Sequence, residues 1–85
     1  MSEPELRRAF RAAMRELRHR KGWTQRDLTR EGKFGTSYVA TLENGTYLPS
    51  LQTFAKLAGL FGVTLEEFGA LLDAQDRLNK LSVAA

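Results

Sequence analysis

The side chains of this sequence carry charges and hydrogen-bonding groups but no catalytic set. Cysteine is absent and His19 is the single histidine, so neither a zinc-binding cluster nor a Cys-His pair can form. The adjacent carboxylates Glu66 and Glu67 fall at a predicted helix start, and no nucleophile-base constellation can be assembled around them. We therefore predict that the chain is not an enzyme and uses no metal or other cofactor.

The basic residues are concentrated in the first part of the chain. Residues 1–33 hold ten Lys/Arg against five Asp/Glu, whereas residues 34–85 hold three Lys/Arg against five Asp/Glu. The overall net charge of +3 is thus an average over a half with +5 and a half with −2. A basic half of this kind can face a polyanion such as nucleic acid, while the other half need not.

The length and the apolar content set limits on the architecture. A chain of 85 residues, 42% of them hydrophobic, suits one domain with a modest core. No apolar run approaches the ~20 residues of a membrane span, and the N-terminus shows no secretion signal. We expect a single domain over 1–85, in which 73–85 form a C-terminal helical extension or tail.

Helix caps and 3.6-residue periodicity recur along the chain, and no segment alternates with period two. Capping-box patterns start at Ser2, Thr24 and Thr64, and glycines stand at the expected helix ends. Five helices are predicted: Ser2 to about Arg20, about 25–31, about Thr36 to Glu43, Pro49-Ser50 to Gly62, and Thr64 to about Leu81. The fourth is expected to turn Leu51, Phe54, Leu57, Ala58 and Phe61 inward, and the apolar residues of the fifth are Leu65, Phe68, Leu71, Leu72 and Leu78. The predicted fold class is therefore all-α.

Two short helices joined by a glycine-containing turn lie in the middle of this order, which is the pattern of a helix-turn-helix. Over about residues 6–72 the chain resembles the Cro/cI-type (XRE-like) family of DNA-binding regulators. The resemblance rests on Thr24-Gln25, Leu28, Leu42-Glu43-Asn44-Gly45, Pro49-Ser50-Leu51 and Phe61-Gly62-Val63-Thr64. It implies a compact five-helix, lambda-repressor-like domain whose second and third helices form the motif.

Three positions depart from the family pattern. Thr29 stands where the family usually has alanine, and Lys33 stands where it usually has glycine in a turn with positive φ. Lysine there would cost about 1 kcal/mol, unless Gly32 takes over the turn and shifts it by one residue. Gly35 occupies the place of the Ser or Thr that normally caps the third helix. The register of this turn is therefore open between two alternatives.

The resemblance implies that the third helix reads base edges through Thr36, Ser37, Ala40 and Thr41. Hydroxyls can donate or accept hydrogen bonds, and a methyl group can contact the thymine methyl. None of the four can make the bidentate contacts that Arg makes to guanine or Gln to adenine. We therefore predict modest direct readout and a larger share of backbone and shape recognition.

Phosphate contacts are expected at the start of the second helix, where free N–H groups and the positive helix end attract anions. The resemblance makes Gln25 a phosphate contact, joined by Thr24, and makes Asn44 a second backbone contact. Position alone adds Arg26, Arg30, Lys33 and Tyr47, although a charged side chain here can equally be an ordinary solvated one. Tyr47 can instead face the core. The arginines at 8, 11, 15 and 18 can act electrostatically or form a solvated face.

Arg18 and Glu43 match an arginine–glutamate pair that the family often places between its first and third helices. This pair would hold the recognition helix against the first helix. Removing Glu43 would then strand a partly buried cation and cost more than the ~0.2–1 kcal/mol of a surface pair.

The C-terminal helix has more apolar residues than a five-helix core can cover. Leu71, Leu78 and Leu81 are predicted to line one side of it, which suggests a homodimer through this helix, although a frayed tail is the alternative. We predict a cytoplasmic, bacterial or phage regulator that binds a two-fold symmetric double-stranded operator, most simply as a repressor or autoregulator. The alternative is a helical protein-interaction module, such as an antitoxin-type protein that holds a partner.

Overall fold

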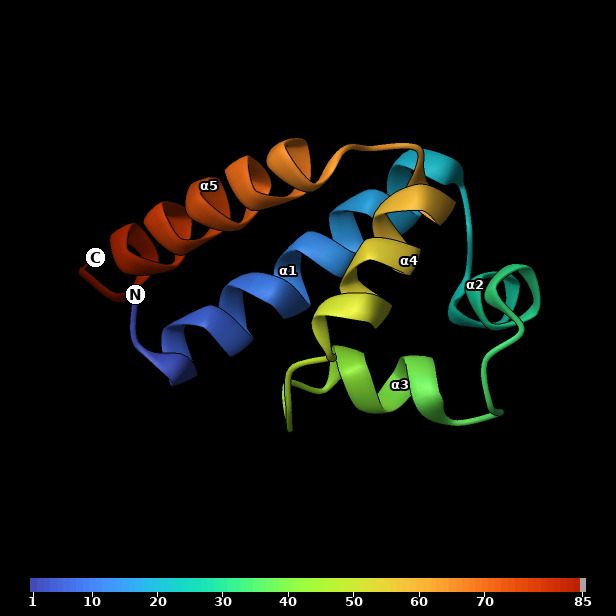
Figure 1. The fold of residues 1–85 in the computed structure, drawn as a ribbon. Coiled ribbons are helices and arrows are strands. Elements are labelled where there is room, and N and C mark those ends of the chain that lie inside the picture. Colours follow the sequence, from blue (N-terminus) through green and yellow to red (C-terminus); the bar gives the residue numbers. More distant parts are fainter. Residues whose placement is uncertain (85) are drawn as a thin grey trace.

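Five helices make up the computed structural model, which describes residues 1–84 and the side chains of residues 1–82. In chain order they are α1 (Glu3–Lys21), α2 (Gln25–Gly32), α3 (Tyr38–Glu43), α4 (Leu51–Phe61) and α5 (Leu65–Ala84). Residues 1–84 contain no strand. The prediction of an all-α, five-helix fold is confirmed (Figure 1).

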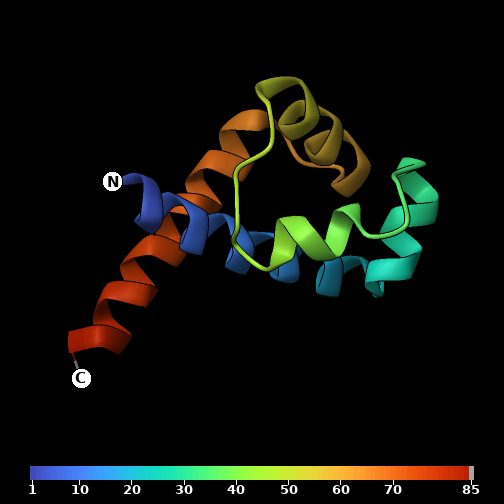
Figure 2. The same cartoon turned by 90° about the horizontal axis from the view of Figure 1, so that it is seen from below.

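The long helices α1 and α5 pack against each other, and α2 and α3 lie away from the C-terminal half of α5 (Figures 1 and 2). Helix α4 packs against α1, α2 and α5, and α3 packs against α1 and α2. The helix-turn-helix is therefore carried at one end of the molecule on a base formed by α1 and α4.

The core is an apolar cluster to which all five helices contribute. Its largest buried side chains are Phe10, Met14, Leu28, Leu42, Leu57 and Phe68. The rings of Phe54 and Phe68 are centred 4.3 Å apart, and the Phe10 ring lies 6.1 Å from that of Phe68. These contacts join α1, α4 and α5 and fix the base on which the motif is mounted.

Two apolar residues at helix starts do not face the core. Leu51 is 76% exposed, so its predicted inward position is wrong, and Leu65 is 48% exposed. Each is the first residue of its helix, directly after a capping Ser50 or Thr64. Leu51 and Leu65 fit the helical spacing of the apolar residues, but the part of each helix that packs against the core begins one turn later.

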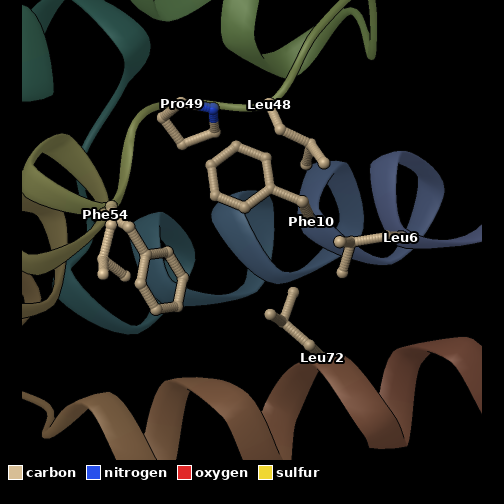
Figure 3. Close-up of a pocket in the computed structure, with 7 residues that line it drawn as sticks. Leu6, Phe10, Leu48, Pro49, Phe54 and Leu72 are labelled. Atoms are coloured by element: carbon tan, nitrogen blue, oxygen red, sulfur yellow. The ribbon is translucent and has the colours of Figure 1, made fainter. Parts of the chain in front are cut away.

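Exposed Leu51 lines an apolar groove between α1, the segment before α4, and α5 (Figure 3). The groove has a volume of about 300 Å³. Its other lining residues are Leu6, Phe10, Leu48, Pro49, Phe54 and Leu72.

Three helices begin with reciprocal capping boxes, as predicted. In each, a hydroxyl accepts the backbone N–H three residues later, and that residue's carboxylate accepts the cap's N–H, in the pairs Ser2–Glu5, Thr24–Asp27 and Thr64–Glu67. The backbone hydrogen bond lowers the pKa of each carboxyl group, that of Glu5 to about 2. Each cap therefore favours the ionised form of its carboxyl group.

The turn between α2 and α3 follows one of the two predicted registers. Lys33 adopts the left-handed conformation, with φ 53°, and caps α2 through its N–H. Gly32 stays inside α2, and a Cβ there would lie 2.3 Å from the Phe34 ring. Glycine at 32 is therefore required by the packing of Phe34, and the positive φ falls on the lysine.

Helix α3 begins two residues later than predicted, at Tyr38 instead of Thr36. Thr36 and Ser37 form a turn, closed by a 3.1 Å hydrogen bond from the Tyr38 N–H to the Gly35 carbonyl. Ser37, not Gly35, occupies the N-cap position, and its side chain makes no capping hydrogen bond. The i to i+3 hydrogen bond from Tyr38 makes residues 36 and 37 a turn that precedes the first α-helical residue.

The predicted extension is helical to residue 84, and residue 85 lies outside the described part of the chain. Lys80 lies 3.2 Å from Glu5 and 2.9 Å from the nearly buried Asp76, so α5 is tied to the start of α1. Leu71 packs partly against the core, whereas Leu78 and Leu81 are 57% and 68% exposed. Within residues 1–84, no helix combines the length and apolar character needed to cross a membrane.

Candidate nucleic-acid interface

A cleft of about 270 Å³ separates the outer faces of α2 and α3. It is lined by Gln25, Arg26 and Thr29 from α2 and by Thr36 and Ala40 from the α3 side. The structure thus brings two residues predicted to contact bases next to two predicted to contact phosphate. Sequence reasoning noted Thr29 only as a departure from the family pattern. Its place one turn after Gln25 is the signal that would have put it on this face.

The hydroxyls around this cleft differ in what they can still donate. Thr41 donates to the Ser37 carbonyl at 2.9 Å, and Thr29 donates to the Gln25 carbonyl at 2.9 Å. These two threonines can therefore offer only a lone pair and a methyl group to DNA. Thr36 and Ser37 donate to no protein group within the described residues, so their hydroxyls can both donate and accept.

The start of α2 presents two free backbone N–H groups. The N–H of Thr24 donates to the Asp27 carboxylate at 2.9 Å, and the N–H of Asp27 donates to the Thr24 hydroxyl at 3.1 Å. Gln25 and Arg26, between them, keep backbone N–H groups that a helix of this kind leaves without an internal partner. An anion at this end would therefore meet those two N–H groups and the proton of the Thr24 hydroxyl.

Arg18 and Glu43 form a bidentate ion pair between α1 and the last residue of α3. The Arg18 Nε lies 2.7 Å from Glu43 Oε2, and its Nη2 lies 2.9 Å from Oε1. Their side chains are only 11% and 1% exposed. The hydrogen bonds to Glu43 raise the pKa of Arg18 above its ordinary value. The position of α3 relative to α1 is thus set by a nearly dry pair of charges.

The same pair is connected to the end of α1 and the start of α2. The third guanidinium nitrogen of Arg18 donates to the Trp23 carbonyl at 2.9 Å, and the Gln25 amide lies 3.5 Å from the Glu43 carboxylate. Gln25 is therefore placed between the ion pair and the surface, with an amide N–H left for an outside acceptor. One network thus joins the end of α1, the start of α2 and the end of α3.

Asn44 and Tyr47 follow α3. The side-chain oxygen of Asn44, Oδ1, accepts from the backbone N–H of Thr46 at 2.9 Å and from the Thr46 hydroxyl, which leaves the side-chain amide nitrogen of Asn44 free to donate. Tyr47 is exposed and its ring lies 6.4 Å from that of Tyr38. Desolvation, with a smaller effect from Tyr38, raises the pKa of Tyr47, so its phenol stays protonated and can donate.

The remaining basic candidates differ in their partners. Arg26 and Lys33 are exposed and form no ion pair within residues 1–82, whereas Arg30 lies 3.1 Å from the Asp27 carboxylate. Arg30 is therefore partly neutralised, and Arg26 is the free cation at the α2–α3 cleft. No group of three His, Asp or Glu side chains in the described residues is placed to hold a metal ion.

Comparison with known proteins agrees with this arrangement. The helix-turn-helix family model matches residues 14–68. A protein of Neisseria meningitidis serogroup B named "Neisseria hypothetical transcription factor" is 31% identical over 83 residues, which are 98% of this chain and 76% of that protein.

The HTH-type transcriptional regulator DdrOP3 of Deinococcus deserti is 33% identical over 54 residues, 64% of this chain and 42% of that protein. No solved structure matches the chain significantly. The matched region includes α2, the turn, α3 and the Arg18–Glu43 pair. The chain therefore belongs to the helix-turn-helix family, as its resemblance to the Cro/cI-type regulators implied.

Proposed function

We propose that this protein is a transcriptional regulator that binds double-stranded DNA in a sequence-dependent way, with α3 in the major groove. The observation that carries the proposal is the α2–α3 cleft, where Gln25 and Arg26 stand beside Thr36 and Ala40. Groups suited to phosphate and groups suited to base edges are thereby presented on one surface. Both named relatives are described as transcription factors or regulators, which supports the same function.

In this proposal the base edges are read by Thr36, Ser37, Ala40 and Thr41. Since Thr41 donates its proton to the Ser37 carbonyl, it would accept from a base amino group or contact a thymine methyl. Thr36 and Ser37, whose hydroxyl protons are free, would adapt to either kind of base edge. Much of the specificity would then come from the shape and deformability of the site.

The backbone would be held by Gln25, Arg26 and Thr24 at the start of α2, with Lys33, Asn44 and Tyr47 around it. The Arg18–Glu43 pair acts on this binding indirectly, because it fixes the distance between α3 and the start of α2. A regulator of this kind would act in the cytoplasm, beside bacterial or phage DNA. Occupation of a promoter would make it a repressor or an autoregulator.

We also propose that the protein acts as a homodimer through α5. Leu78 and Leu81 are exposed on that helix, and the apolar groove beside Leu72 lies against its first half (Figure 3). Leu71 would contribute only its exposed part, because it also packs against the core. A two-fold dimer would set two recognition helices about 34 Å apart, one turn of DNA. A monomer mass at tens of micromolar in light scattering would overturn the dimer.

The test of the function is selection of bound sequences from a random duplex pool. We expect enrichment of a two-fold symmetric motif and a steep fall of affinity with salt. Thr41→Ala and Ser37→Ala should change the enriched sequence, whereas Gln25→Ala should weaken binding to all sequences alike. Failure to enrich any sequence, with weak binding at every salt concentration and a co-purifying protein, would favour the interaction module instead.

A further inference from the structure

The chain leaving α3 passes the N-terminal half of α1 (Figure 2). A second cleft lies there, at the C-terminal end of α3. Its volume is about 200 Å³. It is lined by Pro4, Arg7, Arg8, Arg11, Asn44 and Gly45. Three arginines thus line one small space together with Asn44.

The positive charge of this cleft is only slightly compensated. Arg7 lies 3.1 Å from the Glu3 carboxylate, but that glutamate is largely exposed. Arg8 and Arg11 have no carboxylate within ion-pair distance among the residues whose side chains are described. Like charges held this close repel one another, so an anion between them would lower the energy of the cleft.

The cleft is built on ordered elements. Arg8 and Arg11 project from the well-capped α1, and the Arg11 stem lies beside Gly45, where a Cβ would be 3.7 Å from Arg11 Cδ. Gly45 itself has φ 78°, a conformation that turns the chain sharply after α3. The turn that ends the proposed reading helix is therefore the same turn that forms one wall of the cleft.

We propose that this cationic cleft, formed by Arg7, Arg8 and Arg11 with Asn44, binds the phosphodiester backbone of the duplex that α3 reads. The proposal rests on the proposed function and extends the footprint past the end of α3 onto α1. Asn44 links the two surfaces, because it caps α3 and also lines the cleft. Arg15, half-exposed one turn further along α1, continues the same face toward Glu43. Guanidinium groups bind phosphate through paired hydrogen bonds, which suits a fixed backbone oxygen.

The test compares two double variants with the same change in net charge. Arg8→Gln with Arg11→Gln removes the unpaired cations of the cleft, and Arg20→Gln with Arg77→Gln removes two exposed cations elsewhere. Binding to a mixed-sequence duplex of about 30 base pairs, roughly three helical turns, is measured as a function of salt. Each lost phosphate contact lowers the slope of log K against log salt by about 0.9, so the cleft variant should lose about 1.8.

The control variant should keep most of the wild-type slope, and both variants should keep the wild-type thermal unfolding curve. Ethylation of phosphates at the edge of the site should interfere with binding of the wild type and should not interfere with binding of the cleft variant. Equal slopes for the two variants, with wild-type binding intact, would overturn this proposal alone. A wild-type chain that binds no duplex would overturn both this proposal and the proposed function. Loss of an acidic protein partner with no change in DNA binding would assign the cleft to that partner.

Discussion

The two helices of the motif are held in different ways. Helix α2 begins with a reciprocal cap between Thr24 and Asp27, formed by residues three apart. Helix α3 has six residues and no side-chain cap. It is held instead by buried Val39 and Leu42 and by the ion pair of Glu43 with Arg18. The helix that is proposed to grip the backbone is thus locally encoded, whereas the one proposed to read bases depends on tertiary contacts.

This difference has a consequence for recognition. A six-residue helix is far too short to be stable by itself, so α3 exists only while its packing persists. Any change that moves α1 relative to α4 would also move α3, whereas the capped start of α2 would stay intact. The stability of the domain and the geometry of the proposed DNA contact are therefore coupled through Arg18 and Glu43.

The largest expected effect comes from breaking the tertiary support of α3. Glu43→Ala should lower the free energy of unfolding by about 3 kcal/mol, because it leaves the nearly buried Arg18 guanidinium without its partner. Urea unfolding measures the loss, and hydrogen exchange should show the α3 amides opening before those of α2. Glu16→Ala is the matched control, since Glu16 is exposed and lies 3.9 Å from Arg20. It should cost less than about 0.5 kcal/mol. A Glu43→Ala protein within about 0.3 kcal/mol of wild type would contradict the dependence of α3 on this pair.

The next effect compares the two N-caps directly. Thr24→Ala should cost about 1 kcal/mol, because it removes the hydroxyl that accepts the Asp27 N–H. Ser37→Ala should leave stability within a few tenths of a kcal/mol, since the Ser37 hydroxyl makes no capping bond. Both values come from the same urea titrations. Equal losses at the two positions would show that α3 is capped in solution after all.

A smaller effect is expected in the turn that separates the helices. Lys33→Gly should raise the free energy of unfolding by about 0.5 to 1 kcal/mol, because glycine adopts φ 53° without the strain of a side chain. The greater freedom of glycine in the unfolded chain reduces this gain. Thermal unfolding monitored by circular dichroism is sufficient. A less stable variant would mean that the Lys33 side chain makes a contribution larger than its backbone strain.

The smallest expected effect is the pH dependence of the capping box that Glu5 forms with Ser2 at the start of α1. The pKa of Glu5 falls from the ordinary 4.5 to about 2 on folding, so its ionised form is favoured in the folded chain. This contribution is complete above pH 4.5 and is lost as the pH falls toward 2. The difference in melting temperature between wild type and Glu5→Gln should therefore be a degree or two near neutral pH and vanish near pH 2. A constant difference over this range would show that the cap does not depend on the charge.

The existence of α1, α2, α4 and α5 could be predicted from the chain because their signals are local. A capping box joins residues three apart, and a glycine after the last turn ends a helix whatever packs against it. The starts of α1, α2 and α5 and the ends of α1 and α4 were therefore predicted to within about one residue. The resemblance to the Cro/cI-type family also indicated the Arg18–Glu43 ion pair and the helix-turn-helix.

The start of α3 and the exposure of Leu51 and Leu65 could not be predicted in this way. Where α3 begins depends on the turn at residues 36 and 37, which the hydrogen bond from the Tyr38 N–H to the Gly35 carbonyl closes. Periodicity likewise places Leu51 on the apolar face of α4, but whether that face is buried at the first turn depends on which residues pack against it.

The sequence by itself determined the order of five helices, the caps of four of them and a basic N-terminal half, because short-range hydrogen bonds and apolar spacing encode them. Only the tertiary structure decided which polar groups meet. It placed Arg26 beside Thr36, Glu43 against Arg18, and Arg8 and Arg11 beside Asn44. Residues in these last two groups are 25 or more positions apart, and no local rule specifies their distance. It follows from how α1 and α3 pack around a shared core.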